Sequence, residues 1–134
     1  MTMEVEVKLS RIVINEKSDQ QLIILSEKQG SRSLPIVIGI VEIFAIDRRL
    51  KGIEPPRPMT HDLLANVIKH LGAVIEKVVI DDVRHHTYFA KIHLMLNDKK
   101  KVIVDSRPSD AIALTAGTSV PLFVAEHVLD DAAG

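Results

Sequence analysis

The period of the hydrophobic pattern changes twice along this chain of 134 residues, and this change constrains the fold more than any other feature. Residues 3–10 alternate apolar and polar side chains, which is the period-two pattern of a strand with one buried face. Residues 63–71 instead repeat apolar side chains every three or four positions, which predicts an amphipathic helix. Apolar runs with strand character resume after residue 74. Runs of strands that flank helices predict an α+β domain.

Turn and capping residues divide the chain further. Thr60 suits the N-cap of the second helix, Gly72 suits its end, and Pro108 suits the first turn of a third helix. Asn97 and Asp98 predict a tight turn with positive φ. We expect strands at 3–14, 22–25, 34–38, 74–83, 87–96, 101–105 and 122–125, and helices at 40–51, 60–71, 108–116 and 126–132. The prediction is one compact domain over residues 1–134, with a mixed sheet and the order β-β-β-α-α-β-β-β-α-β-α.

Composition limits the function. Without cysteine the chain has no disulfide, thiolate zinc site or thiol catalysis. A net charge of −1 and 3% aromatic residues argue against tight non-specific nucleic-acid binding, so nucleic acid would be bound weakly. No apolar run reaches the ~20 residues that span a bilayer, and the start of the chain lacks the apolar region of a signal peptide. We therefore expect a cytoplasmic protein with no membrane contact.

The first predicted helix is apolar on nearly all sides over its first two turns. Such a helix is either buried or covered by another subunit, so we expect a homo-oligomer with Ile40, Val41 or Phe44 near its interface. Glu42 lies within this apolar stretch and needs a partner, since burial would otherwise raise its pKa. Arg49 shares its face two turns later, so Glu42 is either half of a structural pair with Arg49 or a functional carboxylate.

The densest polar cluster, residues 105–110, lies where a strand is predicted to end and a helix to begin. Free N–H groups at a helix start favour an anion, and Arg107 could bind a phosphate. Asp105 and Asp110 are suitable ligands for a divalent cation. The structural alternative is that Asp110 caps the helix and Arg107 pairs with a neighbouring carboxylate.

A second polar pair, His61 and Asp62, opens the second helix. A histidine beside an aspartate occurs in metal-dependent phosphohydrolases, although the further ligands of those enzymes are missing from this sequence. An aspartate is also favourable near any helix N-terminus for electrostatic reasons. Both interpretations of the pair remain open.

Taken together, these stretches resemble the bifunctional nuclease family. The resemblance covers residues 5–129, and its most specific parts are 34–39, 56–64, 87–90 and 105–114. The last motif carries Ser106 where the family often has alanine. The resemblance implies a compact α+β domain that often forms oligomers, and some plant members are described as cutting both RNA and DNA. Its motif residues correspond here to Glu42, His61, Asp62, Asp105, Arg107, Ser109 and Asp110.

Two hypotheses from different classes follow. In the first, the chain is a nuclease that hydrolyses phosphodiesters of RNA and DNA with Mg²⁺ or Mn²⁺ held by Asp105 and Asp110, with or without Glu42 as a third ligand. The metal would polarise the phosphodiester, His61 would act as general acid or base, and Arg107 would clamp the phosphate. In the second, the domain is a non-catalytic regulatory, interaction or ligand-binding module that oligomerises through an apolar helix face.

Overall fold

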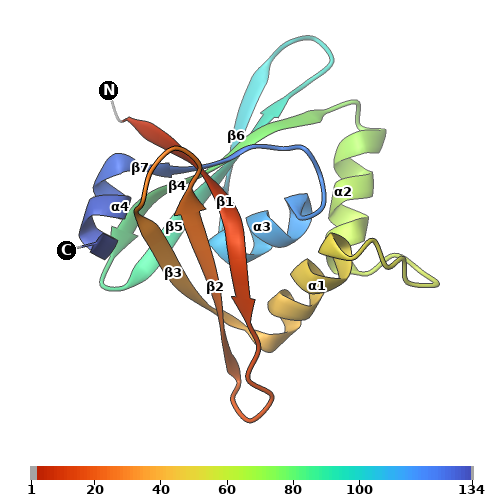
Figure 1. The fold of residues 1–134 in the computed structure, drawn as a ribbon. Helices are drawn as coiled ribbons and strands as arrows, with labels where there is room; N and C mark the ends of the chain where they lie inside the picture. Colours follow the sequence, from red (N-terminus) through yellow and green to blue (C-terminus); the bar gives the residue numbers. More distant parts are fainter. Residues whose placement is uncertain (1–2, 134) are drawn as a thin grey trace.

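Seven strands join in one sheet over the residues that the computed structural model describes, 3–133, and four helices accompany them (Figure 1). The observed order confirms the predicted α+β class and the mixed sheet. The elements are β1 (Glu4–Val13), β2 (Gln20–Glu27), β3 (Ser33–Gly39), α1 (Ile40–Leu50), α2 (Thr60–His70), β4 (Val74–Arg84), β5 (Thr87–Met95), β6 (Lys101–Ser106), α3 (Pro108–Thr115), β7 (Leu122–Ala125) and α4 (Glu126–Ala133).

The strand order across the sheet is β3-β2-β1-β7-β4-β5-β6. Each half is an antiparallel meander of three strands that are consecutive in the chain. The late strand β7 lies between the halves, antiparallel to β1 and parallel to β4, with Val124 opposite both Val5 and Ile80. The last strand of the chain therefore joins the first three strands to the other three.

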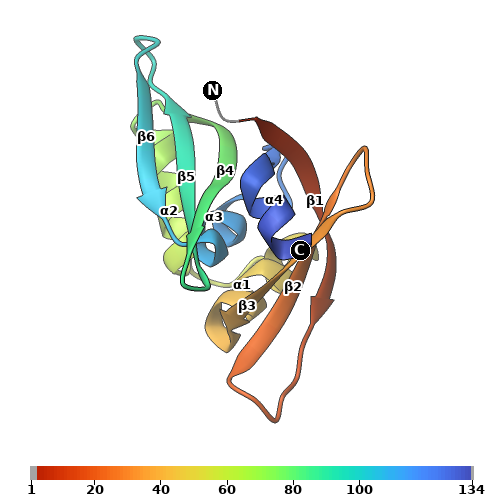
Figure 2. The ribbon, with the colours of Figure 1, turned by 90° about the vertical axis from the view of Figure 1, so that its left-hand side faces the viewer.

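The two halves of the sheet bend around the helices. In Figure 2, β1–β3 and β4–β6 lie on opposite sides of the view, with α3 and α4 between them. Six of the eight residues of α3 are buried, and the small side chains of Ala111 and Ala113 allow close packing of this helix. As a result α3 is fixed firmly in the core, while its N-terminus, with Arg107 at the N-cap, reaches the surface.

One apolar core connects six of the strands with the four helices. Ile23 and Leu34 contribute from the first half of the sheet, Ile80 from the second, Ile43 from α1 and Leu114 from α3, all nearly without solvent exposure. The core continues up to the residues next to Glu42 and Asp110, since both neighbours, Ile43 and Ala111, are fully buried. The backbone that carries these two carboxylates is therefore well supported.

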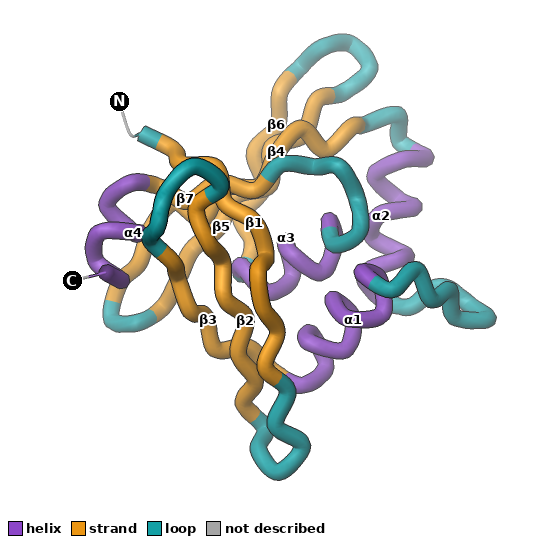
Figure 3. Tube along the Cα trace, in the orientation of Figure 1, coloured by secondary structure: helices purple, strands orange, loops and turns teal. Residues whose placement is uncertain are grey.

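The second helix has the predicted apolar stripe but exposes most of it. Only Ile68 turns towards the core, whereas Leu63, Leu64, Val67 and Leu71 are 42–73% exposed. In Figure 3, α2 stands at the outer edge of the molecule, and the loop that leads into it from α1 extends away from the helices. The α2 stripe is thus largely a surface feature of the single chain.

Two turn predictions were wrong in detail. The N-cap of α2 is Met59 rather than Thr60, and the Met59 N–H donates to the Asp62 carboxylate three residues later (3.0 Å). In the β5–β6 turn, the residue with positive φ is Lys99 (φ 66°), not Asn97 or Asp98. The loop is one residue longer than a two-residue hairpin, and such loops place their left-handed residue last.

Candidate functional site: a polar row at three helix N-termini

Four charged or titratable side chains from three helices form a continuous row, which we call the polar row: Glu42, Arg107, Asp110 and His61. The Arg107 guanidinium donates from Nη2 to Glu42 (3.0 Å) and from Nε to Asp110 (2.8 Å). The other oxygen of Asp110 lies 3.1 Å from His61 Nε2. Residues that are 65 positions apart in the chain are thus linked by direct hydrogen bonds.

The start of each helix sets the position of each member. Glu42 lies in the first turn of α1, His61 is the second residue of α2, and Asp110 is the third residue of α3. Carboxylates are favourable in the first turn because the helix dipole is positive there. The N-termini of three helices therefore meet around one arginine, which provides the countercharge for two carboxylates.

Gly39 makes room for the Glu42 carboxylate. A Cβ atom at this position would lie 2.6 Å from Glu42 Oε2. The backbone φ of Gly39 is −75°, which any residue can adopt, so space rather than conformation explains why a glycine fits here. Even an alanine would push the carboxylate from the position in which it meets Arg107.

Hydrogen bonding shifts the pKa values of two members of the row, Asp110 and Arg107. Burial raises the pKa of the Asp110 carboxyl, but the hydrogen bonds from Arg107 and His61 outweigh this effect and bring its pKa below the ordinary value. Hydrogen bonds to Asp110 and Glu42 likewise raise the pKa of Arg107. An ionised Asp110 can only accept, so His61 must carry its proton on Nε2, and a neutral His61 has its lone pair on Nδ1. Asp110 thus orients His61 as a proton acceptor.

Arg107 remains accessible in spite of its two carboxylate partners. Its side chain is 65% exposed and lines a hollow of about 400 Å³ together with Ser109, Tyr88 and Gly39. Nη1 is not used in either ion pair, so it can donate to a ligand in that hollow. Ser109 is buried at the second position of α3, where it forms part of the wall.

Tyr88 and Gly39 were not singled out by sequence reasoning as site residues. Both lie in stretches that carry the family resemblance, 87–90 and 34–39, and that was the available signal. The structure brings these two stretches beside the third one, which contains Arg107, in a single hollow. The motifs are therefore neighbours in space as well as markers in the sequence.

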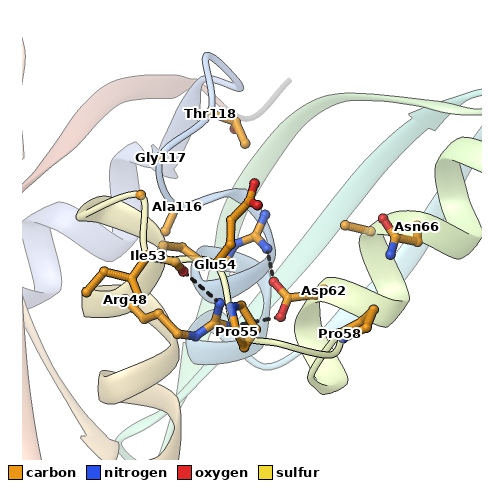
Figure 4. Close-up of a pocket in the computed structure, with 13 residues that line it drawn as sticks. Arg48, Ile53, Glu54, Pro55, Pro58, Asp62, Asn66, Ala116, Gly117 and Thr118 are labelled. Carbon is orange, nitrogen blue, oxygen red and sulfur yellow. Dashed lines mark hydrogen bonds and ion pairs between the residues drawn. The ribbon is translucent and has the colours of Figure 1, made fainter.

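Asp62 belongs to a different cluster. Its carboxylate accepts hydrogen bonds from Arg49 (2.7 Å) and Arg48 (3.1 Å). Arg49 also donates a hydrogen bond to the Leu114 carbonyl of α3 (3.0 Å). Burial raises the Asp62 pKa, but the Met59 N–H and the two guanidiniums bring it below its ordinary value. Figure 4 shows Arg48 and Asp62 of this cluster among the residues that line a hollow. The volume of this hollow is about 480 Å³. These bonds tie α1, α2 and α3 together, and they do not include the polar row.

Asp105 lies apart from Asp110. Its neighbour Val104 pairs with core residue Ile92, so the alternation of the strand directs Asp105 to the opposite face of the sheet. There it is 76% exposed and pairs with Lys91 (3.1 Å). Over the described residues 3–133, no group of three or more His, Asp or Glu side chains is arranged to hold a metal ion.

The structural alternatives raised by the sequence have mixed outcomes. Asp110 directs its oxygens to Arg107 and His61, and the N-terminus of α3 has no side-chain cap. The predicted pairing of Arg107 with a neighbouring carboxylate is confirmed. Glu42 pairs with Arg107 instead of Arg49, because Arg49 is bound to Asp62. The polar row is therefore a network between helices rather than a set of local caps.

The fold and the row together define a class: an α+β domain that presents a histidine–carboxylate pair and an accessible arginine beside a surface hollow. Residues 23–134 match the bifunctional nuclease domain, and the chain belongs to this family. An uncharacterized protein of Mycobacterium tuberculosis is 39% identical over 127 residues, which cover 95% of this chain and 75% of that protein.

More distant relatives are plant proteins. Bifunctional nuclease 1 of Oryza sativa subsp. japonica is 24% identical over 118 residues, or 86% of this chain and 36% of that protein. Bifunctional nuclease 2 of Arabidopsis thaliana is 25% identical over 109 residues, or 79% of this chain and 33% of that protein. This chain thus matches about a third of each plant protein. Among the helices within residues 3–133, none is long and apolar enough to cross a membrane.

Proposed function

We propose that this chain is a nuclease that hydrolyses phosphodiester bonds of RNA and DNA at the polar row. The observation that carries the proposal is the direct linkage of His61, Asp110 and Arg107, an acid–base group, its orienting carboxylate and an exposed cation. His61 would accept the proton of the attacking water, and Arg107 would bind a non-bridging phosphate oxygen in the adjoining hollow. Membership of the bifunctional nuclease family supports this choice of substrate.

Asp110 and Glu42 would act as positioning residues. Asp110 would hold the imidazole in the tautomer that leaves Nδ1 free, and it would stabilise the imidazolium that forms when a proton is taken up. Glu42 would fix the Arg107 fork from the other side. Asp62 would act indirectly: it fixes the start of α2 and thereby the position of the adjacent His61.

The proposal does not include a metal ion shared by Asp105 and Asp110, and it leaves Glu42 and Asp110 as the carboxylates that could hold one. Asp105 and Asp110 have different ion-pair partners and do not fit a metal held jointly by both. Glu42 and Asp110 do face a common cation, but that cation is Arg107, whose guanidinium bridges the two carboxylates. Mg²⁺ or Mn²⁺ at these carboxylates would need Arg107 to turn away.

The test is cleavage of end-labelled single-stranded RNA and DNA with Mg²⁺, with Mn²⁺ and with EDTA. We expect cleavage by the wild type and a loss of at least about 100-fold in His61→Ala and in Arg107→Ala. His70→Ala and Arg11→Ala are the matched controls, since both side chains are exposed and outside the row. Cleavage that survives in both row variants would overturn the proposed site.

A second candidate is a non-catalytic regulatory or ligand-binding domain, and one observation favours it. Glu42, Asp110 and Arg107 already neutralise one another in part, and with a neutral His61 their sum is −1, which does not attract a phosphate. In that case the row would be a structural network. No cleavage of either nucleic acid under any of the three conditions is the result that this candidate predicts.

We also propose a homo-oligomer. Sequence reasoning predicted Ile40, Val41 or Phe44 of the first helix near the interface, but a larger set of exposed apolar side chains lies on the outer face of α2: Leu63, Leu64, Val67 and Leu71. This face is a continuous apolar surface on a single helix, the kind of surface that packs well against a second copy of itself. We therefore assign the interface to α2.

A further inference from the structure

A third hollow, of about 460 Å³, lies beside the polar row and differs from its neighbours in chemistry. Its walls come from α1, from the loop that follows α1 and from the start of α2. The large apolar side chains in these walls are Val41, Phe44, Ile53 and Met59, and each is 48–72% exposed. We call this hollow the apolar pocket.

The apolar pocket is directly connected to the proposed catalytic group. His61 lines the pocket and at the same time bonds Asp110 through Nε2. Arg107, on the far side of Asp110 from His61, borders the separate hollow with Tyr88. A ligand whose phosphate contacts the row would therefore have its next chemical group beside the pocket.

From this geometry we propose that the apolar pocket binds one unstacked nucleobase of a single-stranded nucleic acid, with Phe44 as its stacking surface. The inference rests on the proposed function, because it assumes that the row receives the phosphate. Nucleobases are flat, have two apolar faces and stack well on aromatic rings. Phe44 supplies the phenyl ring among the residues that line this pocket.

The polar groups of the pocket are also suited to a nucleobase. Thr60, Asp47 and Arg48 line it besides the apolar side chains. A hydroxyl, a carboxylate and a guanidinium can together bond the donors and acceptors along a base edge. Asp47 already pairs with Lys51 and Arg48 with Asp62, but a carboxylate and a guanidinium each have further acceptor or donor positions for a ligand. A second copy of the chain has the larger apolar face of α2 available.

The pocket also predicts which form of nucleic acid is preferred. A base inside a duplex is stacked on both faces and can reach a pocket only after it is unpaired and unstacked, which costs free energy. Single strands do not have this cost. The protein should therefore bind and cut single-stranded RNA or DNA in preference to duplexes of the same sequence.

The experiment measures binding by fluorescence anisotropy with two short single-stranded DNA probes in EDTA. One probe has all its bases, and the other has the same backbone with abasic sites along its length. We expect Phe44→Ala to weaken binding of the first probe about 5-fold to 100-fold and to leave the second nearly unchanged. Phe44→Tyr, which keeps a ring, should restore most of the affinity.

Leu63→Ala is the matched control, since it removes an exposed apolar side chain outside the pocket. Equal effects of Phe44→Ala on both probes, no effect on either, or no detectable binding of the base-containing probe by wild type would each overturn the inference. So would a change of oligomeric mass in Phe44→Ala, because Phe44 would then lie in a subunit interface.

The outcome separates this inference from the proposed function. Base-dependent binding at Phe44 without any cleavage would support the pocket and contradict the nuclease. If cleavage depends on His61, and the Phe44→Ala variant cleaves as fast and binds both probes as tightly as the wild type, the result would support the nuclease and contradict the pocket.

Discussion

Replacing Asp62 by asparagine should destabilise the fold by an amount that depends on pH. The asparagine side chain would keep the volume but lose the charge that faces Arg48 and Arg49. Exposed ion pairs contribute at most ~1 kcal/mol each, whereas removing one member of a buried pair costs ~3–5 kcal/mol. Asp62 is 17% exposed and its two partners are similarly covered. An asparagine oxygen can still accept one of the hydrogen bonds, so we expect a loss of about 2 kcal/mol at pH 7.

This loss converts into a measurable shift in melting temperature. Unfolding entropies near 2.1 cal/mol/K per residue give about 0.28 kcal/mol/K for 134 residues. A loss of about 2 kcal/mol should therefore lower Tm by about 7 °C in a calorimetric or circular-dichroism melt. Asp105→Asn is the matched control, and because Asp105 is 76% exposed with one lysine partner, its Tm should change by less than about 2 °C.

The pH dependence distinguishes a charge effect from a packing effect. The pKa of Asp62 is lower in the folded state than its ordinary value of about 3.9. Its contribution is therefore complete above the unfolded-state pKa and is lost as the pH falls through the folded-state pKa. The Tm difference between wild type and Asp62→Asn should thus shrink below about pH 4. A difference that stays constant from pH 7 to pH 3 would refute the argument.

Two further predictions concern the row and the assembly. Gly39→Ala should fold normally by circular dichroism but lower cleavage as much as Glu42→Gln, because the new Cβ would displace the Glu42 carboxylate; full activity would contradict this. Light scattering at micromolar concentration should show an oligomer that Leu63→Glu dissociates and Val41→Glu does not, because the interface is assigned to α2. A monomeric wild type would contradict the proposed oligomer.

Most elements could be predicted from the sequence because their signals are local. The alternation of residues 3–10, the proline at 108 and the glycine at 72 each mark an element through the backbone or side-chain pattern of a few neighbours. The strand predicted at 122–125 has the observed bounds Leu122–Ala125. Its position between β1 and β4 could not be predicted, since strand order depends on contacts between distant parts of the chain.

The sequence also could not predict whether the apolar stripe of α2 faces the core or the surface. Leu63, Leu64 and Val67 form a helical stripe whether it faces the core or another subunit, because the pattern records amphipathicity and not the partner. In this fold the sheet interior is already filled by α3, whose small residues bring it close to β4 and β5. The apolar stripe of α2 therefore remains mostly at the surface.

For the candidate site, the sequence indicated the residue types but not their partners. Arg49 has the right helical spacing to pair with Glu42, yet it bonds Asp62 and the α3 backbone, while Arg107 takes Glu42. Likewise, Asp105 and Asp110 are close in sequence but belong to a strand and a helix that direct them to different partners. Choices between such partners depend on how the helices pack, which local spacing does not determine.

The most direct test of the central claim compares Asp110→Asn with Asp105→Asn in the same cleavage assay on single-stranded RNA and DNA. Both substitutions remove one carboxylate charge from residues 105–110, but only Asp110 belongs to the polar row. If the row is the catalytic site, Asp110→Asn should abolish cleavage while its circular-dichroism spectrum stays native, and Asp105→Asn should retain nearly full activity. Loss of activity in Asp105→Asn with activity kept in Asp110→Asn would contradict the account.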